Sequence, residues 1–378
     1  MAGIYIHIPF CKQACSYCNF HFSTSLRRKN ELVAALLSET ELRRDYLKDE
    51  NIETIYFGGG TPSLLSPRDQ GALIEKIYSV FNISPDAEIT LETNPDDISV
   101  EQLVDWKNEG INRLSIGIQS FFEEDLKWMN RAHTAQQGIN SLRLAAKQFD
   151  NITADLIYGT PLLTDEKWKN NVDKITAEGV AHLSCYSLTV EPKTPLNKMI
   201  REHKSPNIDP DKQSDQFLLL MQWMLEAGYE HYEISNFAKP GFRSRHNSSY
   251  WQGKKYLGIG PSAHSFDGSS RQWNISNNNL YIDSIKRKVI PSEKEILSPT
   301  QQLNEYIMTS LRTIEGLDLN RVDGASRFKL QLASKKFIER GVIVDEKDHL
   351  KLTKEGKLFA DGIAAELFFE EPKKMMPQ

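Results

Sequence analysis

Three of the four cysteines in the chain stand close together, in the stretch "HIPFCKQACSYCNF". Cys11, Cys15 and Cys18 follow the pattern C-x3-C-x2-C, directly after an apolar, strand-like run. Thiolates are soft ligands that suit zinc or an iron–sulfur cluster. A structural zinc ion takes four protein ligands, and neither His7 nor His21, the nearby candidates for a fourth, stands at a finger-like spacing. Three thiolates alone suit a cubane 4Fe-4S cluster with one iron left open to a small molecule.

A second group of candidate site residues stands where predicted strands end. The run "FGGGTP" at 57–62 follows the second predicted strand, and its glycines let the backbone approach a ligand closely. It is no P-loop, because the Lys-Ser/Thr pair that would reach phosphates is absent. Since barrel sites lie at the carboxyl ends of the strands, polar residues that finish four units predict one shared cavity. These residues are Glu92, Gln119, Asp155 and, one helix beyond its strand, Arg131.

The elements that must position these residues alternate between strand and helix from residue 3 to about 235. Short apolar runs are typical of strands buried on both faces, and the amphipathic segments between them begin with capping residues such as Ser99 and Thr164. Six β-then-α units in series predict a parallel sheet with right-handed crossovers. We therefore predict an α/β fold with a partial (β/α)6 barrel; a doubly wound sheet is the alternative. The six runs are 4–8, 54–59, 87–93, 113–119, 152–159 and 182–188.

Two further regions are predicted beyond the barrel domain, which we place at 1–235. Residues 236–298 are rich in Gly, Asn, Ser and aromatics, and we expect a loop-rich connection there. In 299–378, three helical segments and a two-stranded wing outline a winged-helix-like module. Such modules often bind DNA, but residues 301–378 contain 13 basic and 13 acidic side chains, and the whole chain carries a net charge of -5. No nucleic-acid partner is predicted.

The composition also indicates the compartment. No run of 18 apolar residues exists that would span a membrane, and the first residues show neither the basic nor the apolar part of a secretory signal. We expect a soluble, cytoplasmic protein whose cysteines are not paired in disulfides. Cys185 stands apart in a strand-like run, where a lone cysteine is expected to be a small buried apolar residue.

The motif C-x3-C-x-aromatic-C resembles that of the radical S-adenosylmethionine superfamily. The resemblance implies a 4Fe-4S cluster on the three cysteines, whose open iron binds the amino and carboxylate groups of S-adenosylmethionine. Electron transfer from the cluster would then cleave a carbon–sulfur bond and give a 5′-deoxyadenosyl radical. No catalytic side chain is assigned. The residues that the resemblance implies for cofactor contact are Tyr5, Tyr17, Gly59, Gly60, Thr61, Glu92, Gln119, Arg131 and Asp155.

Longer runs along nearly the full chain, among them "YIHIPFC", "IGIQSF", "DLIYGTP" and "GIGPSAHSF", resemble the oxygen-independent coproporphyrinogen III oxidases and their relatives. The oxidases carry a fourth cysteine two positions after the third, where this chain has Phe20. The run "HNSSYW" is similar instead to the haem chaperones of this family.

That similarity implies an imidazole for haem iron, an amide that orients it, and flat aromatic faces for the macrocycle. The residues concerned are His246, Asn247, Tyr250 and Trp251, with His264 as a further candidate. Without the resemblance, the same run reads as a surface loop with a packed Tyr–Trp pair.

The sequence thus predicts a haem chaperone that binds haem and transfers it to an acceptor protein, with a 4Fe-4S cluster and S-adenosylmethionine as cofactors. The alternative is an oxygen-independent coproporphyrinogen III oxidase, an enzyme that decarboxylates propionates during haem biosynthesis. The missing fourth cysteine favours the chaperone, so we expect no coproporphyrinogen III dehydrogenase activity. The acceptor has no signature in the sequence, and the family resemblance implies a membrane-associated one.

Overall fold

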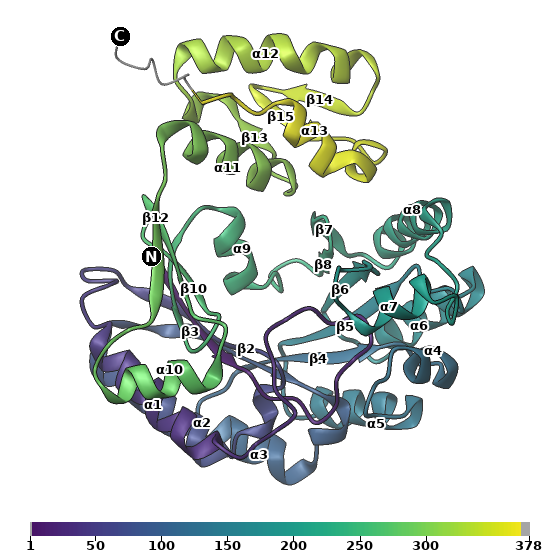
Figure 1. Ribbon diagram of the computed structural model, residues 1–378. Helices are drawn as coiled ribbons and strands as arrows, with labels where there is room; N and C mark the ends of the chain where they lie inside the picture. The colour runs from purple at the N-terminus through teal and green to yellow at the C-terminus, as the bar shows by residue number, and fades with distance from the viewer. Residues whose placement is uncertain (1, 372–378) are drawn as a thin grey trace.

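The computed structural model describes residues 2–371, and its largest feature is one twelve-stranded sheet (Figure 1). The strand order is β12-β11-β10-β9-β1-β2-β3-β4-β5-β6-β8-β7, and β1 to β6 run parallel to one another. Because these six strands are neighbours in their order along the chain, the sheet is singly wound, as in a barrel. The prediction of six β/α units in a partial barrel is confirmed, and the doubly wound alternative is wrong.

The six parallel strands are β1 Ala2–Ile8, β2 Ile52–Gly59, β3 Ile83–Thr93, β4 Arg113–Gln119, β5 Ile152–Tyr158 and β6 His182–Ser187. The helices of this part are α1 Lys29–Leu42, α2 Pro67–Val80, α3 Val100–Asn108, α4 Glu123–Trp128, α5 Ala135–Ala146, α6 Asp165–Ala177, α7 Pro195–Arg201 and α8 Pro210–Glu226. Short 3-10 turns lie at η1 Pro62–Leu64 and η2 Pro95–Asp97. The predicted caps are confirmed, because the Ser99 and Thr164 side chains accept backbone N–H groups at the starts of α3 and α6.

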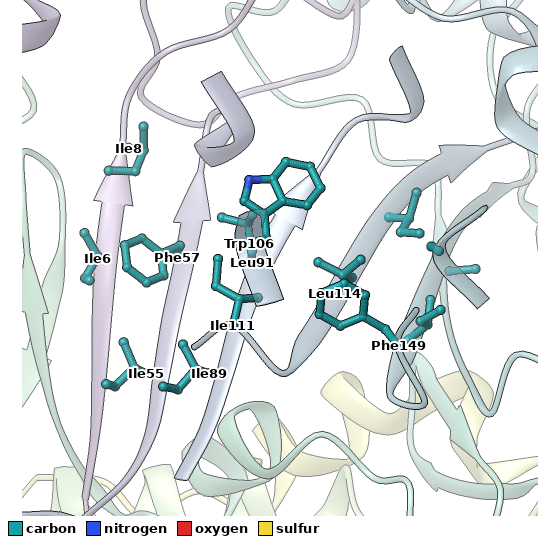
Figure 2. Packing of buried hydrophobic residues seen from close by; sticks show 14 of the residues in the cluster. Ile6, Ile8, Ile55, Phe57, Ile89, Leu91, Trp106, Ile111, Leu114 and Phe149 are labelled. Atoms are coloured by element: carbon teal, nitrogen blue, oxygen red, sulfur yellow. The ribbon is translucent and has the colours of Figure 1, made fainter. Parts of the chain in front are cut away.

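The main core lies between the sheet and these helices. Figure 2 shows side chains of successive strands, such as Ile6, Phe57 and Leu91, packed in a row. Trp106 of α3 is fully buried against the same row. Because the outer face of the parallel strands is buried in this way, the strand ends are held in fixed register with one another.

Residues 236–298 differ from the predicted loop-rich connection, because they extend the sheet beyond β1 and β6. They contain β8 Asn236–Ala238, α9 Arg245–Trp251, β9 Lys255–Ile259, β10 His264–Phe266, β11 Ser270–Asn274, α10 Asn278–Lys286 and β12 Ser292–Ile296. At the edge of the sheet beyond β6, β7 Glu230–Glu233 pairs with β8. The sheet therefore continues across the predicted domain boundary at residue 235. These strands are short, and β11 and β12 consist mostly of polar or charged residues. Their pairing with existing edges, rather than an apolar period of their own, keeps them extended.

A buried carboxylate fixes this added region on α1. Glu39 is fully buried and accepts hydrogen bonds from the Gly260 N–H (2.8 Å), the Asn274 amide (2.8 Å) and the Tyr281 hydroxyl (2.5 Å). Arg43, one turn later, donates to Asn274 at 3.1 Å. The network satisfies a charge that would otherwise be costly to bury, and it joins α1 to β9, β11 and α10.

The C-terminal module has a core of its own, formed by residues such as Ile307, Leu330, Phe337 and Leu350. Its elements are α11 Pro299–Leu311, β13 Leu317–Asp318, η3 Leu319–Arg321, α12 Gly324–Glu339, β14 Ile343–Glu346, β15 His349–Leu352, η4 Gly356–Phe359 and α13 Ala360–Glu366. The predicted wing is β14 and β15, and β13 adds a third strand that the sequence did not predict. Figure 1 shows α9 between the sheet and this module, and α9 contacts α11. Among the described residues no helix is long and apolar enough to cross a bilayer.

Candidate functional site

A cavity of about 460 Å³ opens at the carboxyl ends of the parallel strands, and we call it the barrel cavity. The three clustered cysteines and the predicted strand-end residues line this one space, although they come from six different elements and loops. The sequence-predicted residues that line it are Cys11, Cys15, Tyr17, Cys18, Gly59, Gly60, Thr61, Glu92, Gln119, Arg131 and Asp155. The convergence expected from the strand-end rule is thus present in the structure.

The cysteine loop is held against the end of β2 by backbone contacts. The Gly60 and Thr61 N–H groups donate to the Ile8 and Phe10 carbonyls, at 2.9 and 2.6 Å. A Cβ on Gly60 would lie 2.5 Å from the Phe10 carbonyl oxygen, so only glycine permits this approach. Glycine was predicted here for contact with a ligand, and the structure gives it a second use in placing the cysteine loop.

The cysteine side chains are partly exposed thiols at the mouth of the cavity. Burial raises the pKa of the Cys11 thiol to about 11, and burial also raises the pKa of Cys18. Metal binding to these residues would therefore release protons. Within residues 2–371, no three His, Cys, Asp or Glu side chains converge on a single metal position. A cubane needs no such convergence, since each thiolate binds a different iron.

Two polar side chains keep buried atoms without a partner beside the cysteines. The Arg131 guanidinium donates through Nη2 to the Gly117 carbonyl (2.8 Å) and contacts the Cys15 sulfur at 3.4 Å through Nη1. Its Nε, and the Oε1 of Gln119, are buried and have no hydrogen-bond partner among the described residues. Gln119 also has a φ of 64°, a left-handed conformation that costs energy outside glycine. Unsatisfied groups and local strain in one cavity are typical of a ligand site.

Two carboxyl groups face the same cavity from β3 and β5. Glu92 accepts hydrogen bonds from the Tyr56 hydroxyl (2.8 Å) and the Gly59 N–H (3.1 Å), and Asp155 accepts from Ser115 at 3.1 Å. Burial raises the pKa of Glu92 to about 7, and repulsion from Asp155 adds to the rise while the Tyr56 bond opposes it. Burial likewise raises the pKa of Asp155 to about 6. A cation bound beside them would favour their ionised forms.

The donor set of the barrel cavity fits the two predicted cofactors. Three thiols stand at one end, as a three-cysteine cluster requires, and two carboxyl groups stand where a cationic sulfonium and amino group would be attracted. The unpartnered atoms of Gln119 and Arg131 offer an acceptor and a donor. Tyr17 adds a flat ring to the lining.

Tyr5, unlike the other residues predicted to contact S-adenosylmethionine, does not line the barrel cavity. Its hydroxyl lies 3.1 Å from His7 Nδ1, and its ring stacks on Tyr56 at 6.1 Å. The direct contact between Tyr5 and the cofactor stays a prediction. Tyr5 lies on β1 behind Tyr56 and supports the ring that donates to Glu92.

The "HNSSYW" run forms helix α9 and is not a surface loop. Its histidine, His246, is buried and is not free to bind haem iron. Its ring is 1% exposed, with Thr54 Oγ1 at 2.8 Å from Nδ1 and the Tyr250 hydroxyl at 2.9 Å from Nε2. It stacks on Tyr56 at 4.8 Å. Burial lowers the pKa of His246 to about 3, so the imidazole is neutral. The predicted iron ligation does not fit this conformation, because both nitrogens already have partners.

Helix α9 divides the motif between two environments. His246 and Tyr250, one turn apart, pack toward the sheet. Ser248 and Trp251 point the other way and line a different space against the C-terminal module. We call this space, of about 270 Å³, the module cavity. Its lining residues are Tyr232, Arg243, Ser248, Trp251, Gln252, Tyr306, Ser310, Thr313, Glu315, Gly316, Asp318, Arg321 and His349. Asn247 is half-buried on α9, and the exposed His264 stacks on Trp273 at 6.2 Å.

A carboxylate of the sheet sets the position of α9. Glu88 on β3 accepts the first N–H groups of the helix, those of Arg245 (3.1 Å) and His246 (3.0 Å). An acidic group at a helix start is favourable, because the unpaired N–H groups there carry partial positive charge. No local sequence signal indicates the contact with Glu88, because Glu88 precedes Arg245 by about 157 residues in the chain.

Several lining residues of the barrel cavity were missed. Asn94, Tyr186 and Ser187 come at or just after the ends of β3 and β6. The rule that found Glu92 and Asp155 applies equally to them, so the signal was present. The rim also includes Phe20, which is 67% exposed.

The raised pKa of Glu92 predicts a pH-dependent stability. Because the folded state binds this proton more tightly than the unfolded chain, Glu92 contributes a stabilisation at low pH that is lost as pH rises from about 4.5 to about 7, with a total of about 3 kcal/mol. Glu92→Gln should remove this contribution, so the difference in the free energy of unfolding between the variant and wild type should change by about 3 kcal/mol between pH 4.5 and 7, as measured by denaturant unfolding of the cofactor-free protein at several pH values. The exposed Glu226→Gln is the control and should keep the wild-type slope. An unchanged slope in Glu92→Gln would contradict the prediction.

Comparison with known proteins agrees with this geometry. The Radical SAM superfamily model matches residues 5–175, and the HemN C-terminal domain model matches 297–359. Relatives named "Heme chaperone HemW" include those of Mycobacterium tuberculosis H37Rv (32% identical; 97% of this chain and 94% of the relative covered) and Bacillus subtilis (32%; 96% and 98%). The Escherichia coli relative of that name is 31% identical, with 98% of both chains covered.

The solved coproporphyrinogen III oxidase HemN of Escherichia coli, a radical SAM enzyme, superposes with a TM-score of 0.84. It is 22% identical, and the match covers 97% of this chain and 90% of that one, which establishes a common fold. The chain belongs to the HemW family of haem chaperones, within the radical SAM superfamily.

Proposed function

We propose that the protein binds haem and transfers it to an acceptor protein, and that it holds a 4Fe-4S cluster and S-adenosylmethionine in the barrel cavity. The observation that supports the cofactor part most strongly is the convergence of three thiols and two buried carboxyl groups on one space. The haem part rests on the family, whose members carry the name heme chaperone. The acceptor is proposed to be a haem protein, with membrane-associated ones included.

Each part of the barrel cavity has a proposed task. Cys11, Cys15 and Cys18 hold the cluster, which when bound can pass one electron to the adenosylmethionine sulfonium. Glu92 and Asp155 attract the cationic portion of the cofactor and keep it oriented. The other proposed contacts are made by Tyr17, Gly59, Gly60, Thr61, Gln119 and Arg131.

The haem contacts are proposed for the face of α9 that is not buried in the sheet. Trp251 supplies an aromatic surface at the module cavity, and Asn247 is half-buried beside it. His246 is proposed to anchor α9 on β2 through its contact with Thr54 (2.8 Å) and its stacking on Tyr56, while Tyr250 holds the other ring nitrogen at 2.9 Å.

Two assays distinguish the proposed chaperone function from the oxidase alternative. After anaerobic reconstitution of the cluster, haem titration should give a saturable change in the haem absorption. Incubation with coproporphyrinogen III, adenosylmethionine and a reductant should release no carbon dioxide above the protein-free blank. Phe20, where the oxidases carry cysteine, is the residue that motivates this expectation.

Transfer is tested by mixing the haem-loaded protein with a haem-free b-type haem protein and following the acceptor spectrum. Haem should leave the donor and appear in the acceptor. Strong carbon dioxide release together with no saturable haem binding would contradict the chaperone function and favour the oxidase.

A further inference from the structure

The module cavity is built by parts of the chain that lie far apart in sequence. Helix α9 contributes Ser248 and Trp251, α11 contributes Tyr306, and the β13–η3 and β15 segments contribute Arg321 and His349. It is separate from the barrel cavity, since no residue lines both. None of the tasks proposed above for the iron–sulfur cluster or S-adenosylmethionine uses it.

Two hydrogen-bond donors of this cavity are buried and unpaired. The Ser248 hydroxyl and the Trp251 indole N–H have no hydrogen-bond partner within the described chain, although both side chains line the cavity. A buried donor without a partner costs about 1–3 kcal/mol, so such groups usually meet a ligand or an ordered water. Both belong to the "HNSSYW" run, on the face of α9 opposite to His246.

The charges around the cavity leave one cation available. Arg243 is paired with Glu230 (3.1 Å) and Glu315 (2.7 Å). Arg321 lies over the Tyr306 ring at 4.6 Å and has no carboxylate partner within residues 2–371.

The remaining charged groups of the region are already engaged. Arg312, which lies over the Trp251 ring at 5.0 Å, is paired with Glu233 (3.1 Å) and Asp361 (2.9 Å). Asp318 accepts the Asn320 N–H at 2.9 Å. Its carboxylate is also 4.0 Å from the His349 Nε2.

We propose that the module cavity binds a carboxylate carried on a planar apolar body, through the Arg321 guanidinium, the Ser248 hydroxyl and the Trp251 N–H. Guanidinium and N–H donors suit a carboxylate, and Trp251 and Tyr306 offer aromatic faces to the body that carries it. This inference rests on the proposed haem function, because the two propionates of haem are such carboxylates. A space of about 270 Å³ accommodates the propionate edge, with the rest of the macrocycle outside it.

The consequence is that the C-terminal module takes part in ligand binding. Ser248 and Trp251 belong to α9, whereas Arg321 belongs to the module, so the site is complete only when the two are together. The sequence showed no such role for the module.

The test uses the full-length protein with three probes: hemin, iron-free protoporphyrin IX, and protoporphyrin IX dimethyl ester, which lacks the carboxylates. Arg321→Gln should weaken binding of the two free acids by about tenfold or more, the loss expected for one charge-assisted hydrogen bond. It should leave the weaker binding of the ester unchanged. Trp251→Phe, which removes the N–H and keeps an aromatic ring, should act in the same direction. Arg340→Gln, an exposed arginine at the end of α12, is the matched control and should bind as wild type does.

The outcomes separate this inference from the function on which it rests. Equal binding of the free acids by wild type and Arg321→Gln would mean that water alone fills the cavity, and would overturn the inference while haem binding stands. Failure of wild type to bind any of the probes would overturn both. Arg321-dependent binding of protoporphyrin IX without haem transfer to an acceptor would keep the site and contradict the transfer function.

Discussion

Replacement of Cys15 by serine is expected to abolish the iron–sulfur cluster, with iron content near zero and no cluster absorption after anaerobic reconstitution. Each of the three thiolates binds one iron, and a serine hydroxyl is a hard, weakly acidic group that does not replace a soft thiolate. The same loss is expected for Cys11→Ser and Cys18→Ser, because all three line the barrel cavity. Iron and acid-labile sulfide assays, together with electron paramagnetic resonance of the reduced protein, measure the effect.

The fourth cysteine provides the matched control. Cys185 is 1% exposed on β6 and does not line the barrel cavity. Cys185→Ala should therefore keep its iron, with at most a modest loss of stability from the removed sulfur. Retention of a full cluster by Cys15→Ser, or loss of the cluster from Cys185→Ala, would refute the three-cysteine assignment.

Replacement of His246 by alanine is expected to lower the free energy of unfolding by about 3–5 kcal/mol, the range for removing a large buried ring and leaving its hydrogen-bond partners unsatisfied. The ring packs on Tyr56, and Thr54 and Tyr250 would each lose a buried partner. Denaturant unfolding of the cofactor-free protein measures the loss. Haem absorption of the folded fraction should keep the wild-type band positions, because neither nitrogen of His246 is free to bind iron.

Asn247→Ala, in the same helix but half-buried, is the control and should change stability by much less. The opposite pattern would restore His246 as a haem ligand. In that case His246→Ala would unfold as wild type does, and its haem spectrum would change.

The barrel and most of its cavity could be predicted from the sequence, because both depend on patterns that are local or periodic. Apolar runs give the strands, and the rule that parallel strands end at the same edge brings Glu92, Gln119 and Asp155 together. Arg131 was grouped with them although it stands one helix beyond its strand. Its position depends on a contact with Gly117 that no periodicity encodes.

The helical form of the "HNSSYW" run has a local signal that was missed, because the Ser244 side chain accepts the Asn247 N–H as an N-cap, whereas the burial of His246 depends on contacts across the whole chain. Without the family resemblance, the run reads as a surface loop with a packed Tyr–Trp pair. In the structure, Glu88 adds a second, distant acceptor at the start of helix α9, and Thr54 contacts the imidazole. The strands of 236–298 were missed for a similar reason, since they extend by pairing with β1 and β6 rather than by an apolar period.

The two-sided packing of α9 makes the length of the motif as restrictive as its composition. Successive residues of a helix are turned by about 100° from one another, so one inserted residue between His246 and Trp251 would rotate the tryptophan by that angle. Either the imidazole would keep its contacts with Thr54 and Tyr56 and the indole would leave the module cavity, or the indole would stay in the module cavity and the imidazole would lose those contacts. The number of residues between the histidine and the tryptophan is therefore a structural constraint in its own right. Substitutions do not test this constraint, whereas an insertion does.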